Sequence, residues 1–518
     1  MIAGMVDSIV AAFSPAAGVR RQQARKLLRN YQGAERTRLN SNKRPQNLPA
    51  DTEIGGALGA DALRARARML VRDNAYAWGV VDTIVSSVVG CGIEAMSALE
   101  TPLGEDREDQ NERRQEVWRR WMQHCDYTGR FSFHEIQALI QREIVEAGEV
   151  LVRFRNVPLR HKGVERQVPL AIELIEADQL ASERDTLVVR PETGIRISRG
   201  VETDIDGKVL AYWLYPEHPL SPYHVRREPV RVPASEVLHL YRSERIGQTR
   251  GVSWFHPVIQ WLHDLGMFVD NELQASAVAS CFAVAIKRTT PIGGLNPPST
   301  DDISDSDGNR YDYVQPGMIM HLNPDEDISA VSPGRPNSAA EPWLHLMLRG
   351  IAIGTGLSYE TVGRDYSQTN FSSNRASQLE DRRRFRVWQR YLIDHLCGPV
   401  WMRFCQAAAV AGVEGFPSAA DFLSDPEGSC PVEWQAPGWE WVDPRADQQS
   451  SEAAIRMFQT SYASELGQKG RNWKHVFYQR AQEEALLQRL GLVRPEIQLA
   501  EAQVEPQMVQ AQAAVNAE

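Results

Sequence analysis

Two clusters of acidic residues have the composition of calcium-binding loops, but neither has the spacing. Residues 301–312 read DDISDSDGNRYD, and residues 204–209 read DIDGKV. An EF-hand loop needs a glycine at its sixth position and a bidentate glutamate at its twelfth. With the glycine in register, the twelfth residues are Val314 and Trp213. Calcium binding is therefore not predicted at either cluster, and the second is better explained as a hairpin turn between strands.

Other motifs of catalytic or cofactor chemistry are also missing from the sequence. The glycine-rich stretch GIAIGTGLS, residues 350–358, lacks the lysine of a phosphate-binding loop. The histidines show no HExxH spacing, and there is no GxSxG motif. Isolated histidines such as His134, His263 and His345 are interpreted as packed or surface residues. We predict no catalytic residue, metal or cofactor, although Ser, His and Asp side chains that meet only in space stay an open alternative.

The composition is that of a globular protein with a sizeable core. Of the 518 residues, 42% are hydrophobic and 24% are charged, and a length of roughly 150 residues per domain predicts about three domains. The longest apolar run, residues 275–286, is shorter than the roughly 20 residues that span a bilayer. The N-terminus has the reverse of a secretory charge order. We expect no membrane span, a cytoplasmic location and six cysteines that are free thiols.

The net charge of −10 argues against a protein whose main task is to grip nucleic acid. Charge is unevenly distributed, because residues 20–44 hold nine Lys or Arg and one Glu, a net of +8 that leaves −18 for the remainder. We predict that residues 1–45 form an N-terminal basic arm. The arm is interpreted either as a solvated helix or as a contact for nucleic acid or an acidic partner.

Hydrophobic periodicity predicts an α+β fold. Strand-like segments are found at 149–155, 168–175, 208–215, 236–242 and 431–435. Helical spacing is found at 62–89, 105–124, 132–147, 252–280, 339–356, 373–412, 447–465 and 473–490. We expect Ser132 to cap the third helix, Ser372 or Ser373 to cap the helix over 373–412, and Gly398-Pro399 to kink it.

Two segments between these helices call for a function. Residues 289–338 hold seven Pro and five Gly, with eight acids against two bases, and are too long for an ordinary loop in a compact domain. Residues 364–385 read RDYSQTNFSSNRASQLEDRRRF, a polar run at the start of a long helix. Such a run suits a mobile active-site loop, a solvated connection or the lining of a channel.

Five separated segments, taken in order, are similar to one known family. They are RARARMLVRDNAYAWGVVDTIVSSVVGCGI, LAIELIEADQL, VLHLYRSERIGQTRGVSWFHPVI, DYSQTNFSSNRASQLEDRRRF and WQAPGWEWVDPRADQQSSEAAIRMF. Over residues 20–495 the chain resembles the lambda-type portal proteins of tailed bacteriophages. The resemblance implies a ring-forming portal fold with a wing of helices and strands, a two-helix stem, a small clip, a long wing helix and a helical crown. The implied parts are the N-terminal basic arm (1–45), the wing (46–251), a stem helix (252–288), the clip (289–338), a second stem helix (339–357), the tunnel loop (358–372), the long wing helix and a wing strand (373–444), the crown (445–495) and a flexible tail (496–518).

The resemblance also implies a function and partners. A ring, commonly of twelve subunits, sits at one capsid vertex and passes double-stranded DNA during packaging and ejection. It docks the terminase large subunit, meets the major capsid and scaffold proteins, and later binds head-completion or tail connector proteins. The protein is then found in the virion and, during assembly, in the host cytoplasm. It is not an enzyme and contacts no membrane.

The tunnel loop and the clip supply the implied site residues. Small polar side chains make brief hydrogen bonds to phosphates without releasing counterions, so an acidic ring with such a lining favours sliding over gripping. Two other roles stay open, in which Arg364 and Arg375 pair with Asp365, Glu380 or Asp381, and Tyr366 and Phe371 anchor the loop. The DNA-facing residues are Arg364, Tyr366, Ser367, Gln368, Thr369, Asn370 and Arg375. The clip residues for docking of the motor are Asp301, Asp302, Asp305, Asp307, Asp325, Glu326 and Asp327.

Two other functions are compatible with the residues alone. One is a cytosolic hydrolase in which residues 358–375 form a lid over an active site assembled from scattered Asp and His. The other is a scaffold for protein partners, which predicts no central bore.

Overall fold

The computed structural model describes residues 59–100, 107–185, 194–222, 228–287, 318–322, 339–367, 369–439, 444–471 and 473–492. The chain divides into the units Met1–Glu53 and Ile54–Glu518, and all of these residues belong to the second unit. The predicted basic arm, most of the predicted clip and the predicted tail 496–518 lie outside the described residues.

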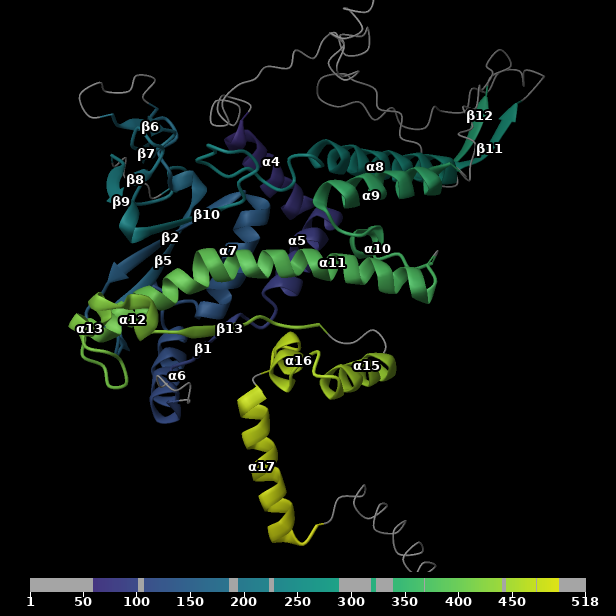
Figure 1. The fold of residues 1–518 in the computed structure, drawn as a ribbon. Coiled ribbons are helices and arrows are strands. Elements are labelled where there is room, and N and C mark those ends of the chain that lie inside the picture. The colour runs from purple at the N-terminus through teal and green to yellow at the C-terminus, as the bar shows by residue number, and fades with distance from the viewer. Residues whose placement is uncertain are drawn as a thin grey trace, which may run out of the picture. The chain divides into compact units, whose positions relative to one another are not determined.

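The described residues form a mixture of helices and sheets, which confirms the α+β expectation in its coarse form (Figure 1). None of the described helices combines the length and apolar character needed to cross a bilayer. The helices are α4 (Ala60–Asp73), α5 (Ala75–Val88), α6 (Glu108–Met122), α7 (Phe133–Glu146), α8 (Ile259–Cys281), α9 (Ala340–Thr355), α10 (Tyr359–Gly363), α11 (Phe371–Leu392), α12 (Gly398–Val410), α13 (Ala419–Ser424), α14 (Pro426–Ser429), α15 (Pro444–Arg456), α16 (Tyr462–Gln468) and α17 (Trp473–Leu490). The strands are β1 (Glu94–Ser97), β2 (Glu149–Asn156), β3 (Arg160–His161), β4 (Val164–Glu165), β5 (Leu170–Glu176), β6 (Arg196–Ser198), β7 (Val201–Thr203), β8 (Val209–Leu214), β9 (Val230–Pro233), β10 (Val237–Tyr241), β11 (Phe282–Lys287), β12 (Met318–Leu322) and β13 (Val432–Gln435).

Local capping sets where several helices begin. The predicted cap of α7 is confirmed, because the Ser132 hydroxyl accepts from the Glu135 amide and the Glu135 carboxylate accepts from the Ser132 amide at 2.7 Å. The single helix predicted over 62–89 is wrong. Asn74 has an extended backbone, and its side chain accepts hydrogen bonds from the amides of Tyr76 and Ala77, so it ends α4 and caps α5.

The long C-terminal helices differ in detail from the sequence prediction. The N-cap of α11 is Asn370 rather than Ser372 or Ser373, because the Asn370 side chain accepts from the Ser373 amide. The kink expected at Gly398-Pro399 is a π-helical turn, Ile393–Cys397, that ends as α12 begins. The helix expected over 447–465 is split into α15 and α16 near Phe458, whose φ is +57°.

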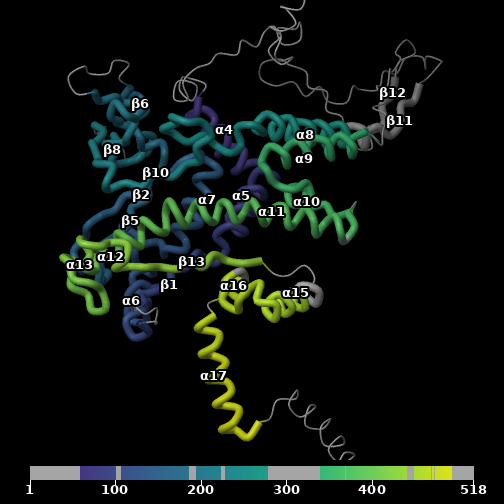
Figure 2. Tube along the Cα trace, viewed as in Figure 1, coloured from purple at the N-terminus to yellow at the C-terminus, as the bar shows by residue number. Residues whose placement is uncertain are grey.

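The described residues include two antiparallel sheets, and the side chains of β2 alternate between the cores on its two faces. Strand β2 lies between β10 and β5, while β6, β7, β8 and β9 form a second sheet in sequence order. Along β2, Val150 and Val152 pack into the main core with α7, and Leu151 packs into a second core with the β6–β9 sheet. Strands β1 and β13, more than 300 residues apart in the chain, pair antiparallel (Figure 2).

Aromatic side chains fill the main core where α6 meets α12. Trp118 is fully buried, stacks on Trp121 at 5.0 Å and meets Phe404 edge-on at 4.9 Å. Trp401 lies 5.1 Å from Trp118 and is also fully buried. Of the five cysteines whose side chains are described, four are buried free thiols and Cys91 is exposed.

A buried carboxylate joins the two cores. Glu149, at the start of β2, accepts from Arg250 at 2.6 Å, from Arg64 at 2.9 Å and from the Gly251 amide at 2.7 Å, and it lies 3.1 Å from His239 Nε2. Burial alone raises the pKa of Glu149, but Arg250 and His239 together hold that pKa well below its usual value. The carboxylate is therefore ionised and binds α4, β2, β10 and the segment before α8.

Two glycines permit this close approach. Gly148 has φ +94°, and a Cβ there would overlap the backbone of Val252. A Cβ on Gly251 would overlap the Gly148 carbonyl. Glycine is therefore required on both sides of the contact that brings Arg250 to Glu149.

We predict that Glu149→Gln destabilises the protein by about 3–5 kcal/mol, because it leaves the buried Arg250 guanidinium without its counter-charge. The measurement is the free energy of unfolding of the monomer in urea. Glu116→Gln is the matched control, since Glu116 forms an exposed pair with Arg120 on α6, and its loss should cost under about 1 kcal/mol.

The pH dependence of the free energy of unfolding shows whether Glu149→Gln acts through the lost charge or through a change of side-chain shape. A carboxylate whose pKa is depressed by folding contributes its stability above the unfolded-state value of about 4.5 and loses it as pH falls toward the folded value. The stability gap between wild type and Glu149→Gln should therefore be constant above pH 4.5 and shrink below it. A gap that does not change with pH would show that the carboxylate charge is not the stabilising feature.

Candidate functional site

Residues 358–372, the implied tunnel loop, connect α9 to α11 by way of the short helix α10 (Figure 1), and the polar run 364–385 continues from this connection into α11. Helix α9 packs on α8, with Phe268 and Trp343 at 4.1 Å between ring centroids. Within α9, Gly350 lies against Trp261 of α8, and Gly354 lies against Val258, the residue before α8. Gly356 ends α9 with φ +76°. The glycine-rich stretch 350–358 is thus a helix-packing surface and a helix end.

A buried carboxylate on α11 fixes the start of this segment. Asp381 is only 4% exposed and accepts three hydrogen bonds from the far side of the connection. The donors are the Ser358 amide at 2.9 Å, the Ser358 hydroxyl at 2.7 Å and the Thr361 hydroxyl at 2.6 Å. Ser358 is also the N-cap of α10. The beginning of the loop is consequently attached to α11, 20 residues or more along the chain.

A second carboxylate organises the loop itself. Asp365 accepts from the Ser367 amide at 3.0 Å, from the Ser367 hydroxyl at 2.6 Å and from the Tyr359 hydroxyl at 2.8 Å. The hydrogen bonds from Ser367, followed by that from Tyr359, lower the pKa of Asp365 to about 2. Asp365 therefore stays ionised and holds the loop in a tight turn.

His345 extends this network to α9. Its Nδ1 is within hydrogen-bond distance of the Tyr359 hydroxyl and lies 3.8 Å from an Asp365 oxygen. Since the Tyr359 hydroxyl donates to Asp365, it accepts from the N–H of His345. Burial, followed by the hydrogen bond to Asp365, raises the pKa of Tyr359 to about 12. His345, Tyr359 and Asp365 together link α9 to the loop.

Arg364 stands between these anchors in a left-handed backbone conformation, with φ +49°. Its side chain is 66% exposed and is 4.0 Å from Asp82 of α5. Among the described residues, Arg364 forms no ion pair with Asp365, Glu380 or Asp381. Asp365 accepts from Tyr359 and Ser367 instead, and Asp381 accepts from Ser358 and Thr361. Asp82 is a partner that the sequence prediction did not name.

The remaining predicted DNA-facing residues lie in the same loop and at the start of α11. The Ser367 hydroxyl donates to Asp365, and the Thr369 hydroxyl donates to the Tyr366 carbonyl at 3.0 Å. Asn370 caps α11, while Arg375 is half-buried in its second turn. Tyr366 is 51% exposed. Gln368 and the seven predicted docking acids, Asp301, Asp302, Asp305, Asp307, Asp325, Glu326 and Asp327, lie outside the described residues.

Sequence reasoning missed the anchors of the loop. His345 was interpreted as a packed or surface residue, and Tyr359 was not singled out at all. The spacing of His345, Tyr359 and Asp365 matches no local motif. The only signal was the density of Ser, Thr and Asp around residues 358–367, which is typical of side chains that bond to nearby backbone.

Comparison with known proteins decides the family. The model of the family described as "Phage portal protein, lambda family" matches residues 36–389, more than half of the chain. The chain belongs to the lambda family of phage portal proteins. Because this family is structural rather than enzymatic, membership favours a portal role over the hydrolase alternative.

Individual portal proteins agree with this assignment. The probable portal protein of Halomonas phage phiHAP-1 is 27% identical over 504 residues, which cover 95% of this chain and 92% of the relative. Portal protein B of Escherichia phage lambda is 22% identical over 321 residues, or 57% of this chain and 60% of the relative.

Solved structures with a similar chain come from gene transfer agent particles. A chain in the neck of the native particle, computed with C12 symmetry, is 12% identical with a TM-score of 0.37, over 80% of this chain and 99% of that one. A chain in the virion of the native particle is 13% identical with a TM-score of 0.36, over 82% and 96%. The family assignment rests on sequence.

We predict that Tyr359→Phe loosens the loop of this portal protein. The change removes the hydroxyl that links Asp365 to His345, and a hydrogen bond of this kind contributes about 1 kcal/mol. Amide hydrogen exchange at Ser367 and Thr369 should accelerate roughly fivefold. Tyr366→Phe is the control, since it removes a hydroxyl from the same loop outside the network. Equal exchange in wild type and Tyr359→Phe would contradict the anchoring role.

Proposed function

We propose that this portal protein forms a closed ring at one vertex of the capsid and that the ring conducts double-stranded DNA during packaging and ejection. In this proposal residues 358–372 are the tunnel loop, α8 and α9 are the stem, and α15 to α17 belong to the crown. Family membership is the observation that carries the proposal. The loop between α9 and α11, held by carboxylates at its beginning and in its turn, supports this role as a lining.

The hydrogen bonds inside the loop suit a lining that DNA slides along. Ser367 and Thr369 use their hydroxyl hydrogens within the loop, so they offer few donors to a passing phosphate. Arg364 is an exposed cation, but it lies near Asp82. Affinity for DNA grows with the number of phosphates that cations neutralise. A loop with few free donors therefore holds duplex DNA weakly at every position.

Exposed apolar side chains on the α8–α9 pair support assembly with further copies of the chain. Leu346 and Ile353, seven residues apart on α9, are 59% and 82% exposed. Residues seven apart share one face of a helix. A closed ring needs a face on each subunit that meets a different face of the next subunit. We assign the Leu346–Ile353 face to this contact.

The partners of the ring follow from the same proposal. The acidic residues at 301–327 would dock the terminase large subunit, and the same end of the ring would later bind head-completion or tail connector proteins. The major capsid and scaffold proteins would surround the ring, which assembles in the host cytoplasm and remains in the virion.

We predict that the purified chain forms rings with an axial opening wide enough for duplex DNA. Top views in negative stain and native mass measurement would show them. Leu346→Glu with Ile353→Glu should abolish the rings, because burying two carboxylates in a subunit contact is costly. Ile205→Glu is the control, since Ile205 is 81% exposed in the β7–β8 hairpin. Monomers alone across a range of ionic strengths would contradict the proposal.

We predict that Gln368→Lys with Thr369→Lys leaves ring assembly intact but slows DNA packaging. Two added cations per subunit increase phosphate binding at the lining. Asn370 is left unchanged, because its replacement would remove the cap of α11. The control is Gln368→Asn with Thr369→Ser, which changes shape without charge. DNA filling at the wild-type rate in the lysine variant would exclude contact between this loop and DNA.

A further inference from the structure

A stripe of cations occupies the face of α11 that borders α16. Leu379, Arg382, Arg383 and Arg386 are spaced at i, i+3, i+4 and i+7, so they lie on one face of the helix. At this spacing an internal helix contact is normally apolar. Here three of the four residues are arginines. The face is therefore built for a charged ligand rather than for packing.

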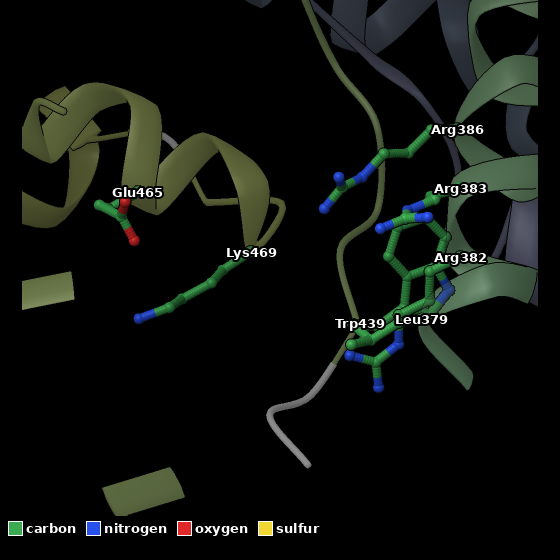
Figure 3. A pocket seen from close by; sticks show the side chains of 7 residues that line it. All are labelled: Leu379, Arg382, Arg383, Arg386, Trp439, Glu465 and Lys469. Atoms are coloured by element: carbon green, nitrogen blue, oxygen red, sulfur yellow. The ribbon is translucent and has the colours of Figure 1, made fainter. Parts of the chain in front are cut away.

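This face forms one wall of a cleft of about 280 Å³. Figure 3 shows the arginines with Leu379 and Trp439 on one side, and Glu465 and Lys469 on the other. Gly470, next to Lys469, lies against the backbone of Pro437 and Gly438 and so keeps the two walls together. The cleft thus lies between α11, the segment after β13 and the end of α16.

Among the described residues that line the cleft, four side chains are cationic and one is acidic. The one acid, Glu465, accepts a hydrogen bond from the Ser451 hydroxyl at 2.8 Å. Within the part of the chain that the structure describes, Arg383 and Arg386 form no ion pair. Arg386 lies over the Trp439 ring at 5.8 Å, and the buried indole N–H of Trp439 has no acceptor. Arg383 and Arg386 therefore lack the partners of a structural ion-pair network among the described residues, so an external anion fits them.

We propose that this cleft binds the phosphodiester backbone of duplex DNA, at a site separate from the tunnel loop. Arginine forks suit phosphate oxygens, and half or more of the hydrogen bonds between proteins and DNA go to phosphate and sugar oxygens from residues such as arginine. The proposal rests on the portal function, because it needs DNA near α11. Helix α11 starts at Asn370 of the proposed tunnel loop, and Arg382 follows about 18 Å along the helix axis at 1.5 Å per residue.

The acidic C-terminal segment of this chain is an alternative ligand for the cleft. Residues 496–518 hold four Glu and no Lys or Arg. A peptide carboxylate would also pair with arginine. Duplex DNA is favoured over the tail as the ligand, because the cleft arginines lie on α11, the helix that directly follows the proposed tunnel loop.

The test compares full-length Arg383→Gln with Arg386→Gln against wild type in binding a fluorescent 30-base-pair duplex over a range of salt concentrations. Loss of two phosphate contacts should lower the slope of log affinity against log salt by about 1.8 and weaken binding at least roughly tenfold in 0.1 M salt. The basic residues 20–44 contribute the same background to both proteins and cancel in the comparison.

Arg120→Gln with Arg390→Gln is the matched control. These arginines carry the same total charge, lie outside the cleft and form surface pairs with Glu116 and Asp394. A slope that is unchanged in the cleft variant, or reduced equally in the control, overturns the proposal. The same comparison is repeated after removal of residues 496–518. A cleft variant that then binds DNA as tightly as the truncated wild type shows that the cleft does not hold DNA even without the tail, and this result also overturns the proposal. Ring images of each variant separate this outcome from failure of the portal function itself.

Discussion

The ionised carboxylate of Glu149, buried between two cores, is the constraint on which the rest of the structure depends. A charge this far from water is tolerated only when partners surround it, and Arg250, Arg64 and His239 come from three separate parts of the chain. Satisfying one carboxylate therefore positions α4, the central sheet and the segment that leads into α8. Because Gly148 allows the backbones to touch at this point, the direction of α8 is fixed by a contact that leaves little room for adjustment.

Carboxylates that accept several hydrogen bonds also hold the loop between α9 and α11. Asp381 ties the entry of the loop to α11, and Asp365 ties its turn to Tyr359 and His345. Both carboxylates use hydroxyl and amide donors rather than cations, so the loop is ordered without becoming basic. The loop can therefore be well ordered and still bind DNA weakly. Its backbone is held by hydrogen bonds, while the hydroxyl hydrogens that would donate to a phosphate already donate within the loop.

Positive and negative side chains are distributed unevenly along the chain. The sequence carries a net charge of −10, yet α11 has six arginines and two acids, of which Asp381 is buried and bonded. An acidic chain with a cationic helix face can repel a polyanion over most of its surface and bind it at one place. The tunnel loop and the α11 cleft would then have opposite tasks, transit in the first and retention in the second.

The sequence by itself determined what depends on neighbours along the chain. Period-3.6 patterns located most of the described helices, and period-two patterns located β2, β5, β8, β10 and β13 but missed the other described strands. Ser132 with Glu135 marked the start of α7, because capping groups lie within three residues of each other. The order of separated motifs also sufficed for the family. Tertiary structure alone decided the partners of Glu149, the link from His345 to Asp365 and the arginine-lined cleft, since these join residues whose separation in sequence follows no fixed spacing. Long-range ion pairs and hydrogen bonds leave no periodic trace in a sequence, so their geometry appears only once the chain is folded.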